Sequence, residues 1–216
     1  METGEIVRGD RSSALGSNEL VSVKPSTHKG ALIDAMRRIA LAKGFPATTV
    51  DEVCERAGVT KGSFYHHFNG KDDLGLAALQ AYFEDVGAAF SAGEWSTVED
   101  PVERLLAFVT HAAEVSGGPV MVYGCLIGSF ALDLAETWPD LQERTSTMFG
   151  ALRDVVAGLV RDAANSRGRS LDADLFGDQF LAVVEGSIVL AKAHADPAIT
   201  QRGITLFGQH LELLLR

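Results

Sequence analysis

The stretch that decides the fold runs from Thr48 to Leu74 and reads TTVDEVCERAGVTKGSFYHHFNGKDDL. Thr49 and Glu52 have the Thr-x-x-Glu spacing of a capping box, which predicts a short helix ending near Ala57. Gly58 then permits a tight turn, and Thr60 is placed to cap a second short helix, Lys61 to His67. Two short helices joined by a glycine-bearing turn of about four residues are typical of a helix-turn-helix.

A helix-turn-helix reads DNA with the first residues of its second helix. Phe64 and Phe68 are four residues apart, so both are expected to point into the core, which leaves Tyr65, His66 and His67 on the outer side. We therefore expect DNA contacts from Thr49, Thr60, Lys61, Gly62, Ser63, Tyr65, His66 and Lys71, the last as a cation beside the free backbone N–H groups of the next helix. The alternative is that these are ordinary solvated helix residues.

Apolar residues recur at helical spacing from Ser26 to the C-terminus, and strand-like alternation does not persist anywhere. Gly44 is a stop signal for the first helix, and Pro101 suits the first turn of a later one. The sequence predicts an all-α fold with about nine helices. After the helix-turn-helix, these are expected near residues 72–90, 101–115, 120–135, 141–164, 173–194 and 199–215.

The composition is that of a globular protein, with 216 residues, 46% hydrophobic and 22% charged. The formal net charge of -10 argues against a protein coated in nucleic acid, but the charge is uneven. Residues 24–75 hold eight Lys and Arg against six Asp and Glu, whereas residues 76–216 hold nine against nineteen. We predict a flexible tail (1–23), a helix-turn-helix DNA-binding domain (24–75) and a ligand-binding and dimerisation domain (76–216).

Several other classes of protein are disfavoured. The two cysteines, Cys54 and Cys125, are far apart and form no CxxC pair, so the sequence does not support a disulfide framework or a zinc site. Residues 1–23 lack the apolar core of a secretory signal, so the cytoplasm is the expected compartment. The charge-free run from Val115 to Leu132 is broken at Gly117-Gly118-Pro119, which favours a buried helix over a membrane span. We find no catalytic or phosphate-binding motif, and expect no enzyme activity, cofactor or metal.

The stretch from Leu32 to Leu74 resembles the TetR family of bacterial transcriptional regulators. The resemblance is carried by Gly44-Phe45, Thr48-Thr49-Val50, Ala57-Gly58-Val59, Gly62-Ser63-Phe64-Tyr65-His66-His67-Phe68 and Lys71-Asp72-Asp73-Leu74. It implies a three-helix DNA-reading head on an all-α body that binds a ligand and dimerises. The segments 124–128 and 185–188 also resemble the branch of acrylate- and N-ethylmaleimide-responsive repressors, although Ser129-Phe130 replaces the Asn-Leu often found there.

The family resemblance implies an apolar ligand pocket in the body. The residues expected to line it are Phe83, Phe108, His111, Tyr123, Cys125, Phe130, Trp138 and Phe149, and plain core packing is the alternative for each aromatic. Two interpretations of Cys125 are open: a reactive thiol that senses electrophiles or oxidants, and a small buried hydrophobic residue. No Lys or Arg lies near it in sequence to lower the pKa of the thiol, which favours the second. His111 and Glu114, three residues apart, suit a pocket rim or surface pair better than a metal site.

The last two helices are expected to form the dimer. One predicted stripe is Phe176, Phe180, Val183, Ser187 and Leu190, and the other is Ile204, Phe207, Leu211 and Leu214. The sequence thus predicts a homodimeric repressor that binds a palindromic DNA operator through Lys61–His67 and is released by a largely apolar small molecule. An activator or a ligand-independent regulator is the alternative, and an all-α enzyme or a dimerisation module without DNA binding is a remote one.

Overall fold

The computed structural model describes residues 27–121, 123–133 and 138–216, and these residues are α-helical with no strand, which confirms the predicted all-α class. The elements are α1 (His28–Lys43), α2 (Val50–Ala57), α3 (Lys61–His67), α4 (Lys71–Ser91), the 3-10 helix η1 (Glu94–Thr97), α5 (Pro101–Ser116), α6 (Leu126–Asp133), α7 (Pro139–Ser166), α8 (Ala173–His194) and α9 (Ala198–Leu214).

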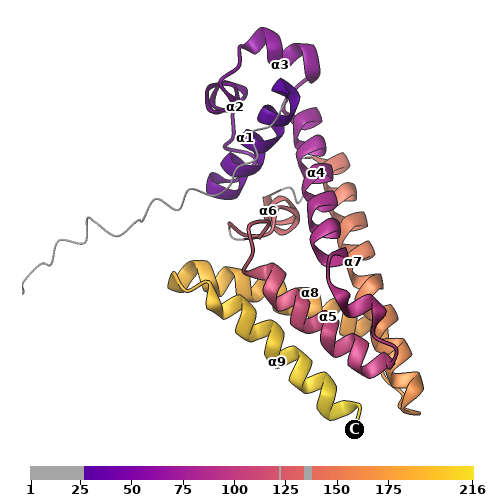
Figure 1. The fold of residues 1–216 in the computed structure, drawn as a ribbon. Helices are drawn as coiled ribbons and strands as arrows, with labels where there is room; N and C mark the ends of the chain where they lie inside the picture. Colours follow the sequence, from indigo (N-terminus) through magenta and orange to yellow (C-terminus); the bar gives the residue numbers. More distant parts are fainter. Residues whose placement is uncertain (1–26, 122, 134–137) are drawn as a thin grey trace, which may run out of the picture.

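Helices α1, α2 and α3 form a small head at one end of the molecule (Figure 1). Thr27 caps α1 by accepting a hydrogen bond from the Gly30 amide, and α1 ends at Gly44, whose φ of 88° suits glycine. The core of the head is apolar and fully buried, with Leu32 and Met36 from α1 and Phe64 from α3. The predicted inward direction of Phe64 and Phe68 is confirmed, since both are buried.

Helix α4 is the structural link between head and body, and Figure 1 shows it running from beside α1 and α3 down along α7. Leu74 and Ala78 are buried in its first half, Tyr82 and Val86 in its second. The cap residue of this helix is Gly70, which has no side chain to offer a hydrogen bond. The backbone and side-chain amides of the preceding Asn69 donate to the carboxylate of Asp73 in the first turn.

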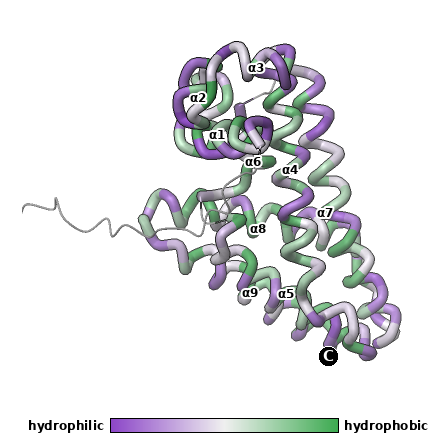
Figure 2. Tube along the Cα trace, turned by 45° about the horizontal axis from the view of Figure 1, so that its top comes forward, coloured by the Kyte–Doolittle hydropathy of each residue, from purple (hydrophilic) through white to green (hydrophobic). Residues whose placement is uncertain are grey.

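The body is a bundle in which α7 packs against α8 and α9 packs against both α5 and α8. Each of these helices alternates hydrophobic and hydrophilic residues along its length (Figure 2), as expected where one face is buried. None of the described helices is both long and apolar enough to span a membrane.

The predicted helix at 120–135 is shorter than expected. Gly124 has a φ of 113°, outside the helical range, so α6 begins only at Leu126. Its last helical residue is Asp133, and residues 134–137 lie outside the described part of the chain. The predicted tail, residues 1–23, also lies outside it.

Candidate nucleic-acid interface and ligand cavity

The helix-turn-helix is built by the capping groups that its sequence supplies. The Thr49 hydroxyl accepts from the Glu52 amide while Glu52 Oε2 accepts from the Thr49 amide at 3.0 Å, so the capping box is complete. Gly58 ends α2 in the left-handed region, and Thr60 caps α3 by accepting from the Ser63 amide at 3.2 Å. Thr49 and Thr60 therefore act first as structural caps.

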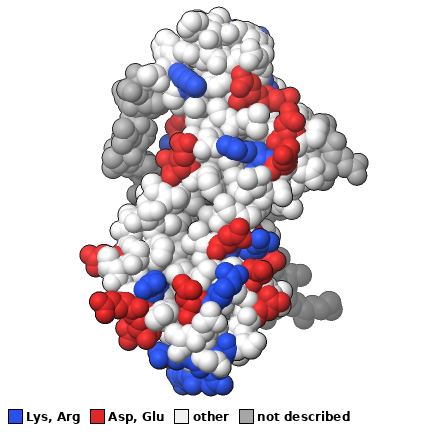
Figure 3. All heavy atoms as spheres, turned by 90° about the vertical axis from the view of Figure 1, so that its right-hand side faces the viewer, with Lys and Arg blue, Asp and Glu red and all other residues white. Residues whose placement is uncertain are grey.

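The beginning of α3 is exposed to solvent. Lys61, Gly62, Tyr65 and His66 are all exposed, and Tyr65 keeps 61% of its surface accessible. Ser63 is half-buried, and its hydroxyl lies 3.1 Å from His28 Nδ1 at the start of α1. On the face in Figure 3, the top of the head carries mostly uncharged side chains. This surface offers hydroxyl, imidazole and backbone donors to DNA.

Two cations of this region are already engaged within the protein. Lys61 Nζ lies 2.6 Å from Asp51 Oδ1, an exposed pair that water and salt screen. Lys71 is half-buried, and its ammonium group donates to the backbone oxygens of Phe45 and Pro46, both at 3.2 Å. Its Nζ also lies 4.6 Å from the centre of the Phe45 ring. Lys71, whose predicted phosphate contact stays a prediction, holds the loop after α1.

Phe45 joins the head to the body. Its ring is fully buried, with centroid distances of 4.8 Å to Phe130 and 5.4 Å to Trp138. Its amide donates to Asp133 Oδ2 at 2.9 Å, at the last turn of α6. The head is therefore attached to α6 through one aromatic ring and one charge-assisted hydrogen bond.

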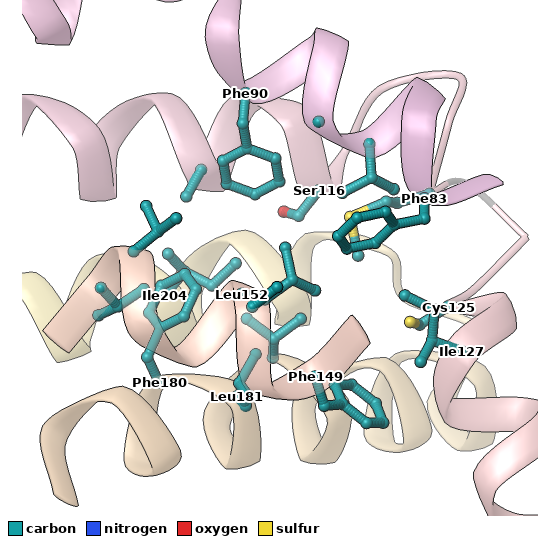
Figure 4. Close-up of a pocket in the computed structure, with 18 of the residues that line it drawn as sticks. Phe83, Phe90, Ser116, Cys125, Ile127, Phe149, Leu152, Phe180, Leu181 and Ile204 are labelled. Carbon is teal, nitrogen blue, oxygen red and sulfur yellow. The ribbon is translucent and has the colours of Figure 1, made fainter. Parts of the chain in front are cut away.

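A cavity of about 270 Å³ lies in the body between α4, α5, α7 and α8. Figure 4 shows Cys125 and Ile127 at one end, Phe180 and Ile204 toward the other, and the Phe83, Phe90 and Phe149 rings between them. The lining is almost entirely apolar, which is the usual character of a small-molecule site.

The predicted pocket residues divide into two groups. Phe83, Phe108, Cys125 and Phe149 line the cavity. The other four do not: Phe130 and Trp138 pack on Phe45 at the junction with the head, Tyr123 is half exposed to solvent, and His111 turns its Nε2 to the Ala89 carbonyl at 2.9 Å. Placing these four in the pocket was therefore wrong, because each has a packing partner elsewhere or faces water.

Cys125 is a buried thiol whose sulfur accepts a hydrogen bond from the Gly128 amide at 3.4 Å. Burial is the main cause that raises its pKa far above the ordinary range, and the nearby Glu185 carboxylate raises it further. A reactive cysteine needs thiolate character, so this environment favours the interpretation of Cys125 as a buried hydrophobic residue over that of a sensor. Within the described ranges there is no cluster of three metal-ligating side chains, and His111 Nδ1 meets Glu114 Oε2 only at 3.8 Å.

Comparison with known proteins places these features in a family. Residues 32–78 match the model of the tetR family of bacterial regulatory proteins, and residues 101–207 match that of the tetracyclin repressor-like C-terminal domain. The chain belongs to the TetR family. It is accordingly a transcriptional regulator whose N-terminal helix-turn-helix binds DNA.

Individual TetR-family relatives are distant but extend over most of the chain. The transcriptional regulator AcuR of Cereibacter sphaeroides is 28% identical over 78% of either chain. The transcriptional repressor DhaR of a Mycobacterium species is 29% identical, covering 74% of this chain and 80% of its own. A crystal structure of a regulatory protein TetR from Rhodobacter sphaeroides has a TM-score of 0.71 at 28% identity, covering 83% of this chain and 96% of that chain.

The stripes predicted for the TetR-family dimer mostly face the protein's own core. Phe180, Ser187, Ile204, Phe207 and Leu211 are buried within the single chain, and Phe176 and Val183 are half-buried. Only Leu190 and Leu214 are exposed. The prediction chose the wrong face because helical periodicity identifies an apolar stripe but not what covers it.

A different face of the same two helices is exposed. On α8 it consists of Leu175, Gln179, Ala182, Gly186, Val189 and Ala193, and on α9 of Arg202, Leu206, Gln209 and Leu213. The residues on α8 follow spacings of four and three, which is the repeat of a helix-packing seam. Gly186 has no other atoms near the position of a Cβ, so this surface is open for close approach.

Sequence reasoning also missed three residues that lie in the cavity or at the junction between head and body of this chain. Glu185 and Trp95 line the cavity, and Asp133 fixes Phe45. Glu185 is the one carboxylate on α8 between Asp178 and the C-terminus of that helix, but its position in the sequence does not show that it faces a cavity. The roles of Trp95 and Asp133 depend on contacts between elements distant in sequence.

Proposed function

We propose that the protein is a homodimeric repressor that leaves a palindromic operator when a small, largely apolar molecule occupies the cavity of the body. The observation that carries this proposal is the double role of α4. Its first half supports the head through Lys71, which donates to the Phe45 and Pro46 carbonyls, and its second half lines the cavity through Tyr82, Phe83 and Phe90. A ligand that changes the tilt of α4 would therefore change the position of the reading helix.

DNA contact is assigned to the exposed residues at the start of α3, namely Lys61, Gly62, Tyr65 and His66, with Ser63 beside them. In a homodimer, two copies of α3 would enter successive major grooves about 34–36 Å apart. The exposed faces of α8 and α9 are the proposed interface, and chromosomal DNA as the partner makes the cytoplasm the expected compartment.

Release from DNA needs only a modest coupling free energy between ligand binding and DNA binding. A ligand that favours one tilt of α4 by ~1–3 kcal/mol changes the affinity for DNA by roughly 5- to 150-fold. The cavity favours this repressor over the ligand-independent alternative, because an empty apolar space of about 270 Å³ costs packing energy that a bound ligand would recover.

The test is selection of genomic DNA fragments by the purified protein, followed by a gel shift on the enriched sequence. We expect one palindrome to be enriched and its complex to weaken when a cavity-binding compound is added. Enrichment without any response to a compound that demonstrably binds the cavity would contradict the release mechanism, and a transcription assay that shows activation would contradict the repressor assignment.

A further inference from the structure

Glu185 is the one charged residue among the described residues that line the cavity. It lies on α8 and is half-buried. A Cβ atom at Gly128 of α6 would collide with Glu185 Oε2, so the glycine leaves the space that the carboxylate occupies. The fold thus accommodates a carboxylate at a wall that is otherwise apolar.

Three other polar side chains of the cavity already donate their protons to backbone carbonyls, and a fourth, Ser91, is a solvent-exposed residue of the lining. The Ser116 hydroxyl donates to the Ala113 carbonyl at 2.7 Å, and the Tyr82 hydroxyl donates to the Gly124 carbonyl at 3.3 Å. The Trp95 indole donates to the Phe90 carbonyl at 2.8 Å. The oxygens of Glu185 remain as acceptors, so the cavity offers acceptors to a ligand and few donors.

Glu185 also lacks a cation in contact. The ion pairs formed by the described residues do not include it. Burial raises the pKa of its carboxyl group, and the Cys125 thiol and the more distant charge of Lys192 offset this in part. A carboxylate in apolar surroundings is costly unless a positive or hydrogen-bonding partner compensates it.

We propose, resting on the effector role proposed above, that the cavity binds an apolar amine whose ammonium group donates to Glu185 while its hydrophobic body lies among Phe83, Phe90 and Phe149. An ammonium group supplies both the opposite charge and the N–H donors that this wall lacks. The aromatic rings add favourable contact with a cation near their faces.

The same geometry disfavours organic acids. A carboxylate ligand would meet the like charge of Glu185 and, within the described lining, no Lys, Arg or His to pair with. The acrylate-type effector that the branch resemblance implies therefore does not match this cavity. A cavity of about 270 Å³ suits a compact body such as one phenyl ring on a short alkyl chain.

The test uses three compounds with the same body and different ends, namely phenylbutylamine, phenylbutanol and phenylbutyrate. Their binding to the full-length protein is measured by isothermal titration calorimetry, in the wild type and in Glu185→Gln. The matched control is Glu143→Gln, the same change at an exposed residue of α7 outside the cavity.

We expect the amine to bind the wild type about tenfold or more tightly than the alcohol, since its hydrogen bond is charge-assisted, and the acid more weakly than both. Glu185→Gln should remove the preference for the amine and leave the affinity for the alcohol unchanged, which also shows that the variant keeps its fold. Glu143→Gln should behave as the wild type.

Three outcomes overturn the proposal: the acid binds as tightly as the amine, the preference survives in Glu185→Gln, or none of the three compounds binds. A gel shift on the selected operator separates this failure from failure of the proposed function. DNA binding that weakens with the alcohol but shows no preference for the amine leaves the regulator assignment intact and removes only the ligand class.

Discussion

At the scale of single residues, Glu52 couples the helix-turn-helix to pH. Its carboxylate accepts from Lys43 at 2.5 Å and from the Thr49 hydroxyl and amide, and these bonds lower its pKa from 4.5 to about 2. Because the pKa is lower in the folded state, the stabilisation is present above about pH 4.5 and is lost as the pH falls toward 2.

We therefore expect Glu52→Gln to destabilise the protein at neutral pH and to cost progressively less as the pH falls from about 4.5 toward 2. Urea denaturation of both proteins over this range measures the difference. A cost that stays constant with pH would show that the charge of Glu52 contributes nothing to the capping box.

Lys61 and Asp51 give a second prediction at this scale. Asp51 holds the Lys61 ammonium group at 2.6 Å and places a negative charge where DNA phosphates would lie. Asp51→Asn should therefore strengthen DNA binding several-fold, while the loss of an exposed ion pair costs the fold at most about 1 kcal/mol.

Lys61→Ala removes the other partner of the same ion pair and should have the opposite effect on DNA binding. It should weaken DNA binding and reduce the slope of log affinity against log salt by about 1 if Lys61 contacts a phosphate. Fluorescence anisotropy with labelled operator measures both variants. If neither variant changes the affinity for DNA, the surface that contacts DNA lies away from Lys61 and Asp51.

At the scale of elements, the junction of α1, α4 and α6 at Phe45 is sensitive to small changes. A Cβ on Gly75 of α4 would lie 2.8 Å from Phe45 Cε2, whereas a Cβ on Gly87 of the same helix would meet nothing within 4 Å. Gly75→Ala should therefore destabilise the protein by ~1–3 kcal/mol through overpacking. Gly87→Ala should be neutral or stabilise it by up to ~1 kcal/mol, because alanine favours helix.

Chemical denaturation of the two variants side by side tests this contrast. Since the Phe45 ring also contacts Phe130, we expect Gly75→Ala to alter the response of DNA binding to an effector as well. Equal stability of the two variants would mean that the ring moves aside without cost and that the junction is not tightly packed.

The sequence predicts features that depend on residues close together in the chain, and it does not predict contacts between residues far apart in the chain. Thr49, Gly58 and Thr60 were correctly placed because caps and turns depend on neighbours three or four residues away. Phe130 and Trp138 were misplaced because their partner, Phe45, lies about 85 to 90 residues away, and periodicity carries no information about such contacts. The bonds of Lys71 to Phe45 and Pro46, about 25 residues away, were missed for the same reason. Glu185 was missed because a carboxylate looks the same in sequence whether it faces water or a cavity.

At the scale of the whole molecule, the same limit explains the predicted dimer. Phe180 on α8 and Ile204 and Leu211 on α9 belong to regular apolar stripes, but the chain buries them against its own helices. The weaker stripe through Gly186 and Leu206 remains for a partner. A two-fold interface requires a self-complementary surface. We propose that this face, where small and aliphatic residues alternate with Gln179, Arg202 and Gln209, supplies it.

This assignment gives the last prediction. Leu206, 53% exposed at the middle of α9, should be buried by the second copy, so Leu206→Arg should place two unpaired charges near the two-fold axis and favour the monomer. Leu132→Arg is the control, since Leu132 is 79% exposed on α6, away from α8 and α9 in sequence. Sedimentation velocity should find the control dimeric and Leu206→Arg largely monomeric, with the head still folded in both. Because a monomer presents one α3 to DNA instead of two, Leu206→Arg should also lose most of its affinity for the palindrome while keeping the weak, salt-sensitive binding of a single head. A dimeric Leu206→Arg would instead direct the search for the interface to another face of the body.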